Sequence, residues 1–256
     1  MREPTNLTCE YQTNPIGVET PLPRFGWINS ASRRGERQIA YRLVVRTADR
    51  VVWDTGRVES EAHHQIEYAG EPLASSSRYE WSVEVWGQAD DSPAAGGPAA
   101  FETALLAPDE WDASWITMSE PRAFETDTKH VGGDSGHAQH TEGHYWAIYF
   151  HTAFELPAPV RRARAYVSGL GYYRLHVNGT RVGEFHLEPA QSDYTHGAYY
   201  NTYDVTRFLA TKGNGIGIVV GNGRHISPFG YGTPRAILRL EIELEDGSRT
   251  AITTNE

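Results

Sequence analysis

Residues 129–144 read KHVGGDSGHAQHTEGH and gather side chains of the types that bind metals. The final HTEGH has two histidines at i and i+4, as in zinc-protease helices, but Glu142 stands midway between them and Gly143 disfavours a helix. The segment is poor in apolar residues, which favours a loop insertion over a metal site. The ligands available to a metal here are His130, Asp134, His137, His140, Glu142 and His144.

A second group of chemically capable side chains lies in GLGYYRLHVNGTRVGEFHLEP, residues 169–189. Asn178-Gly179 predicts a hairpin, because a two-residue type I′ turn needs positive φ at both positions. In the strand before the turn, Tyr172, Arg174 and His176 alternate with apolar residues and share one face. A ring, a guanidinium and an imidazole could hold a sugar, which offers C–H patches and hydroxyls. On the residues alone, a solvated strand face is the simpler interpretation.

The elements that must position these side chains are short strands. IAYRLVVRT (39–47) and YEWSVEVW (79–86) alternate apolar and polar residues, as do YYRLHV (172–177) and ILRLEIEL (237–244). A period of two is typical of half-buried antiparallel strands. No stretch has the pattern of a long amphipathic helix, so the sequence predicts an all-β fold.

The strand spacing predicts two β-sandwiches. Residues 1–106 have the pattern of a fibronectin type III-like, or immunoglobulin-like, sandwich without a disulfide. Within it, GQADDSPAAGGPAA (87–100) is expected to be a surface loop before a last strand, AFETALL. Residues 107–121 form a connector with two tryptophans. Residues 122–256, with the His-rich insertion at about 124–144, predict a jelly-roll β-sandwich.

Charge and composition narrow the classes of partner. The net charge of -10 argues against nucleic acid, which is bound by clustered Lys and Arg. No apolar run approaches the roughly 20 residues needed to cross a bilayer, so we expect no membrane association. The single cysteine, Cys9, and the absence of a charged-then-apolar leader predict a cytoplasmic chain.

Several motifs in fixed order resemble the N-terminal part of bacterial α-L-rhamnosidases. They are CEYQTNPIGVETPLPRFGW, VVWDTGRVES, RYEWSVEVW, EWDASWI, RRARAYVSGLGYYRLHVNGTRVGEFHLEPAQSDY, YNTYDVT and VVGNGRH. The resemblance covers almost the whole chain except the His-rich insertion. It implies that the second sandwich is galactose-binding-like.

The resemblance also implies a division of labour. In that family a further β-domain and an (α/α)₆ barrel follow the two sandwiches, and the barrel carries the acidic residues that hydrolyse terminal α-L-rhamnose with inversion. We therefore expect this chain to be inactive by itself, with no catalytic residue of its own. Its implied partners are the barrel of the same polypeptide and a rhamnose-containing glycan or glycoside.

In some members the second sandwich binds L-rhamnose together with calcium, although no cofactor is required. Matching positions here are Asn178 of VNG and Asp193 and Tyr194 of SDY, which join Tyr172 and Arg174 as expected carbohydrate-binding residues. Similar proteins have Gly-Trp-Thr-Asp-Tyr where this chain has AQSDY. The loss of that tryptophan weakens the case for stacking against a sugar.

The glycine-rich loop GNGRHISPFGYGTPR (221–235) has two interpretations. It could reach the catalytic barrel, or its glycines could serve only the turns of a long sandwich loop. The side chains that would face the barrel are Arg224, His225, Phe229 and Tyr231.

Three alternatives to a sugar-binding accessory part stay open. The two sandwiches could brace the barrel and bind no sugar, or the chain could be a stand-alone lectin-like protein. A related lyase acting on rhamnose-linked glucuronate shares a similar architecture, and the barrel would decide between the two enzymes.

Overall fold

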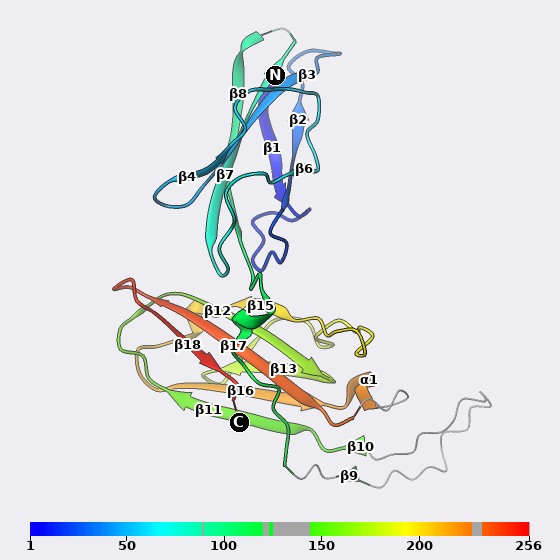
Figure 1. The fold of residues 1–256 in the computed structure, drawn as a ribbon, viewed down its shortest axis with the longest axis vertical. Helices are drawn as coiled ribbons and strands as arrows, with labels where there is room; N and C mark the ends of the chain where they lie inside the picture. Colours follow the sequence, from blue (N-terminus) through cyan, green and yellow to red (C-terminus); the bar gives the residue numbers. More distant parts are fainter. Residues whose placement is uncertain (89, 120–122, 125–143, 227–231, 256) are drawn as a thin grey trace, which may run out of the picture. The chain divides into compact units, whose positions relative to one another are not determined.

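The computed structural model describes residues 1–256 apart from 89, 120–122, 125–143, 227–231 and 256. The chain divides into two compact units, Met1–Glu110 and Trp111–Glu256. Both consist of antiparallel sheets, which confirms the predicted all-β class (Figure 1). No helix in the described part of the chain is long and apolar enough to cross a membrane. The side chains weighed as metal ligands within 125–143 lie outside the described residues, and of His144 only the backbone is described.

The first unit has two sheets, ordered β1-β2-β6 and β4-β3-β7-β8, with β5 pairing β3. This is the predicted immunoglobulin-like sandwich. Its strands are β1 (Arg2–Cys9), β2 (Arg24–Ser30), β3 (Gln38–Arg46), β4 (Val51–Asp54), β5 (Val58–Glu59), β6 (Ile66–Glu67), β7 (Arg78–Gly87) and β8 (Asp90–Glu102).

The period-two pattern of β3 and β7 directs one set of side chains into the core of the first unit. Leu43, Val45 and Trp81 are buried there. The ring of Phe25 from the facing sheet lies 4.8 Å from that of Trp81, a spacing typical of attractive aromatic pairs. Aromatic side chains thus connect the two sheets of the first unit, as a disulfide does in many such sandwiches. Cys9 is buried as a free thiol.

The prediction of a surface loop at 87–100 is wrong, because most of these residues belong to β8. This strand pairs with β7 from Gly87↔Asp90 to Arg78↔Glu102, with two register shifts. Its composition, rich in Pro and Gly, suggested a loop. Prolines are tolerated because β8 is an edge strand, where one side of the backbone needs no partner.

The second unit also has two main sheets, ordered β11-β16-β13-β14 and β15-β12-β17-β18, and a two-stranded β10-β9 pair (Figure 1). Its strands are β9 (Ala123–Phe124), β10 (His144–Tyr145), β11 (Ile148–Phe154), β12 (Val160–Leu170), β13 (Tyr172–Val177), β14 (Thr180–Val182), β15 (Asn201–Asp204), β16 (Asn214–Gly221), β17 (Arg235–Leu244) and β18 (Arg249–Thr253). Short helical turns are η1 (Pro108–Trp111), η3 (Thr206–Phe208) and α1 (Gly223–Ile226).

The core of the second unit lies between its two main sheets. Alternate residues of β13, β16 and β17 are buried in it, including Leu175, Ile218 and Leu240. The other face of β17 carries Glu241 and Glu243, which pair with arginines of their own sheet. The half-buried strand predicted from the alternation is confirmed.

Part of the expected connector is hydrogen-bonded into the second unit. Ile116 forms a bridge with Ala236, and Ser114 and Thr254 exchange two hydrogen bonds. The ring of Trp111 lies edge-on to Tyr200 at 5.1 Å. The stretch from Trp111 to Thr117 is therefore anchored to the second sandwich.

Asn178 and Gly179 have φ of 50° and 78° and join β13 to β14, which confirms the predicted hairpin. The Asn178 side chain holds the turn against β16. Its Nδ2 donates to the Phe208 carbonyl at 2.8 Å and to Asn214 Oδ1 at 3.1 Å, and its Oδ1 accepts from the Gly215 backbone at 2.7 Å. Asn214, buried at 1% exposure, continues the link to Ala210. Both polar ends of the Asn178 amide thus serve the fold.

Gly171 and Gly223 allow the turn between β12 and β13 to pack against the chain that leaves β16. A Cβ on Gly171, at φ 117°, would lie 2.0 Å from the carbonyl oxygen of Gly221. A Cβ on Gly223, at φ 51°, would lie 3.0 Å from the Tyr172 nitrogen. Steric contact therefore explains why Gly171 and Gly223 are glycines, since any other residue would strain this close approach of the two backbone segments.

We predict that Asn178→Ala lowers the free energy of unfolding by about 2 kcal/mol, from lost hydrogen bonds and a left-handed backbone without Asn. Urea denaturation of the chain measures it. Asn178→Gly keeps the backbone freedom and removes only the amide. If Asn178→Gly is as stable as the parent chain, the amide does not hold the turn.

We predict that Gly171→Ala destabilises the chain by at least about 2 kcal/mol, because the backbone must move away from Gly221. Gly217→Ala is the matched control, since a Cβ there has no neighbour closer than 3.8 Å. The control should be neutral or slightly stabilising. Equal losses in the two variants would show that the close approach at Gly171 is unimportant.

Candidate functional site

The face of β13 that was expected to bind sugar is an outer face of its sheet. Tyr173, Leu175 and Val177 are buried, so Tyr172, Arg174 and His176 point away from the core. Arg174 is exposed, and Tyr172 and His176 are half-buried. The alternation read from the sequence therefore assigns these side chains to the correct faces.

The pairing of β16 with both β13 and β11 adds side chains from elsewhere in the chain to this face. Arg174, Val219 and Tyr149 lie in one row across the three strands. His176, Gly217 and His151 form the next row. Tyr149 is 75% exposed and His151 is also exposed. We call this surface the glycine-floored face; it consists of Tyr149, His151, Ala153, Tyr172, Arg174, His176, Arg181, Gly215, Gly217, Val219 and Gly221.

Sequence reasoning singled out only Tyr172, Arg174 and His176 of this face, and not the residues that β11, β14 and β16 contribute. A weak signal was available in NGIGIVVG, where glycines recur at alternate positions of a strand. Their combination with Tyr172 and Arg174 depends on which strands are neighbours. That information is not local in the sequence.

At one end of β13 the structure brings together two motifs that the sequence treated separately. The ring of Tyr194, from SDY, lies edge-on to that of His225, from GNGRH, at 5.1 Å. His225 is only 4% exposed, and burial, followed by the charge of Arg235, lowers the pKa of its imidazole. Its position is set by the Gly223 turn, which packs against Tyr172.

His225 is therefore part of the interior of the second unit, so it offers little surface to the barrel. Of the other residues expected to face the barrel, Phe229 and Tyr231 lie outside the described residues, and only the backbone of Arg224 is described. The expectation of a barrel-facing loop stays a prediction for those three.

Asp193 is exposed and organises its own loop. Its carboxylate accepts hydrogen bonds from the Thr195 hydroxyl at 2.6 Å and backbone N–H at 3.0 Å, and pairs with His196 Nδ1 at 3.0 Å. The Thr195 hydrogen bonds, with a contribution from His196, hold the pKa of Asp193 below its ordinary value. This side chain is thus partly committed to the loop.

Calcium binding by the second unit stays a prediction. Calcium takes six to eight oxygen ligands, whereas no three His, Cys, Asp or Glu side chains in the described parts of the chain gather as metal ligands. Asn178, the other expected ligand, sits at the far end of β13 from Tyr172, six residues or roughly 20 Å away along a strand. Asn178 and Tyr172 therefore cannot touch the same monosaccharide.

A polar network around the buried Tyr173 was not predicted. The Tyr203 hydroxyl donates to Glu188 Oε2 at 2.7 Å and also contacts the Tyr173 hydroxyl at 2.8 Å, and Asn201 donates to both tyrosines. Burial raises the pKa of Tyr173 and of Tyr203. The network ties the segment before Pro189 to the core, so its role is structural.

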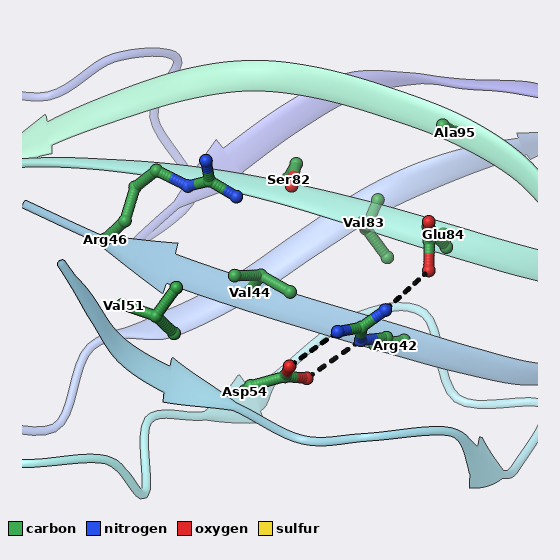
Figure 2. A pocket seen from close by; sticks show the side chains of 9 residues that line it. All are labelled: Arg42, Val44, Arg46, Val51, Asp54, Ser82, Val83, Glu84 and Ala95. Carbon is green, nitrogen blue, oxygen red and sulfur yellow. Dashed lines mark hydrogen bonds and ion pairs between the residues drawn. The ribbon is translucent and has the colours of Figure 1, made fainter.

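Two concave regions elsewhere are weaker candidates. In the first unit a hollow of about 220 Å³ lies over β3, β4 and β7 (Figure 2). Arg42 there pairs with Asp54 at 2.7 Å and Glu84 at 3.5 Å, and hydrogen bonds from Arg42 lower the pKa of Asp54 to about 2. The hollow is small for a ligand site, and the charge of Arg42 is already compensated.

In the second unit a groove of about 570 Å³ lies between the edge strands β11 and β18. Its walls are about equally polar and apolar, with Phe150, Phe154 and Ile252 beside His151, Thr152 and Asn255. It offers hydroxyl, imidazole and amide groups to a saccharide, but no arginine is among the residues that line it. The glycine-floored face, with its ring, guanidinium and imidazole groups, fits a saccharide better.

Both units match known protein families. Residues 4–107 match the family model described as the Rha78A-like, N-terminal immunoglobulin domain, and residues 158–256 match the α-L-rhamnosidase N-terminal domain. The chain is 32% identical over 271 residues to an α-L-rhamnosidase of Formosa agariphila. The alignment covers 96% of this chain and 28% of that protein.

Solved structures agree with this relationship. An α-L-rhamnosidase from Dictyoglumus thermophilum superimposes with a TM-score of 0.88 at 33% identity, over 100% of this chain and 29% of that one. The native enzyme from Aspergillus terreus has a TM-score of 0.82 at 25% identity, over 99% and 28% of the two chains. The chain thus spans less than a third of each of these three relatives, and it is the N-terminal part of an α-L-rhamnosidase-like protein.

Proposed function

We propose that this chain is the accessory part of an α-L-rhamnosidase whose catalytic barrel lies elsewhere in the polypeptide, and that the second unit holds the rhamnose-containing substrate. The observation that carries the first half is the match of both units to N-terminal domains named for this enzyme class. The second half is supported by the outward ring and guanidinium of Tyr172 and Arg174.

The chemistry explains why an accessory part is useful. Inverting hydrolysis needs a general acid and a general base on opposite sides of the glycosidic bond, and the family resemblance assigns both to the barrel. Side chains of this chain would only bind and orient the saccharide. Tyr172 would stack against an apolar sugar face, and Arg174 would donate hydrogen bonds to hydroxyls.

A purely structural role is the second candidate, and specific observations favour it. The amide of Asn178 holds a turn, His225 is buried, and Asp193 organises its loop. Three of the residues expected to bind sugar or face the barrel thus contribute to folding. A brace of this kind would support the barrel without contacting substrate.

The first test compares hydrolysis of nitrophenyl α-L-rhamnoside by the parent polypeptide and by residues 1–256 alone. We predict activity in the parent and none in the isolated chain, because the carboxylate pair lies in the barrel. Hydrolysis by the isolated chain would contradict the proposed division. An inactive parent would contradict the assignment as a rhamnosidase.

The second test is calorimetric titration of the isolated chain with L-rhamnose, with and without added calcium. We predict roughly millimolar binding that weakens about five- to tenfold in Tyr172→Ala, since a ring contact contributes on the order of 1 kcal/mol. Tyr199→Ala is the matched control, because Tyr199 is an exposed tyrosine of the same unit at 60% exposure. Absence of heat in both conditions would favour the brace.

A further inference from the structure

The central strand of the glycine-floored face has a row of glycines that the fold does not require. Gly215, Gly217 and Gly221 share the outer face of β16. Their φ values are not in the left-handed region, and a Cβ on any of them would have no neighbour closer than 3.8 Å. This contrasts with Gly171 and Gly223, where close backbone contacts demand glycine.

Glycine in a strand interior is unfavourable, because it has more conformational freedom to lose and no side chain to pack. Backbone conformation therefore does not explain why three glycines lie on one face of one strand. Their effect is a strip without side chains, interrupted only by Val219 and bordered by β13 and β11. Two strand spacings separate those borders by roughly 10 Å.

The strands of this sheet carry no carboxylate. The chain has 33 Asp and Glu against 23 Lys and Arg, yet β11, β13, β14 and β16 contain none of the acidic residues. Their arginines and histidines are Arg174, Arg181, His151 and His176, and all four lie on the glycine-floored face.

The arginines of this face are not compensated by acids. Arg174 is exposed and has no ion pair among the described residues. Arg181 donates to the Phe185 carbonyl and lies 3.5 Å from His186 Nδ1, neither of which carries negative charge. On the opposite sheet, by contrast, Arg162 pairs with Glu243 and Arg164 with Asp204. The glycine-floored face is thus locally positive in an acidic protein.

We propose that the glycine-floored face binds an acidic saccharide, with the sugar ring lying over the glycine strip and its carboxylate or sulfate group meeting Arg174. This rests on the proposed saccharide-binding role of the second unit and names the ligand class. Arg forms charge-assisted, bidentate hydrogen bonds with such anions. Tyr172 lies beside Gly221, and Tyr149 lies beside Val219, the side chain that interrupts the strip; both rings can contact sugar C–H groups.

A protein surface fits the same face less well. Stable protein interfaces bury about 800 Å² on each partner around an apolar core. The apolar side chains on this face that are not aromatic are only Val219 and Ala153. A narrow strip between polar rows matches the width of a saccharide chain better than a protein partner.

The experiment titrates the chain with tetragalacturonate, cellotetraose and L-rhamnose in a calorimeter. We expect tetragalacturonate to bind more tightly than cellotetraose and to weaken as salt is raised. Arg174→Gln should reduce tetragalacturonate affinity about tenfold, through loss of one charge-assisted contact. Gly217→Val, which places a side chain in the strip, should abolish binding while circular dichroism shows an intact fold.

Arg249→Gln is the matched control, because Arg249 is an exposed arginine on the other sheet, with its side chain 58% exposed. Equal losses in Arg249→Gln and Arg174→Gln would overturn the proposal, since binding would then follow net charge. Equal affinity for cellotetraose, or unchanged binding in Gly217→Val, would also overturn it. If L-rhamnose binds and tetragalacturonate does not, only the acidic class is wrong. If neither binds, the proposed saccharide role fails as well.

Discussion

The antiparallel pairing of β16 with β13 on one side and β11 on the other is the constraint on which the rest of the second unit depends. It fixes which side chains meet, because a slip of one residue would exchange the core face for the outer face. In the observed register Ile216, Ile218 and Val220 enter the core. The same register sends the glycines outward.

Both ends of that pairing are held by specific chemistry. At one end the Asn178 amide bonds to the backbone of Gly215, and Asn214 continues the link inward. At the other end, Gly171 and Gly223 permit a close backbone approach that any side chain would block. Neither the Asn178 contacts nor the close approach at Gly171 and Gly223 involves the side chains of the outer face between them. The fold therefore places few constraints on the residue types of that face.

Local chemistry explains what the sequence could predict. Asn178-Gly179 marked the hairpin because few residues accept positive φ, and the alternation around Tyr172 assigned the faces of β13. Tyr149 and His151 were not foreseen, since they join the face through pairing with residues about 70 positions away. The contact of His225 with Tyr194 could not be predicted either, because α1 and a loop about 30 residues before it in the sequence create it. The strand at 90–102 was missed because its Pro and Gly content indicates a loop unless the partner strand is known.

The central claim is that saccharide lies along the glycine-floored face, and nuclear magnetic resonance of the ¹⁵N-labelled chain tests it most directly. Glycine amides occupy a separate region of the amide spectrum, so the strip can be followed while L-rhamnose or tetragalacturonate is added. The account predicts that the amide signals of Gly215, Gly217 and Gly221 shift together with that of Arg174. Shifts confined to the loop of Asp193 and Tyr194, or no shifts at all, would contradict it.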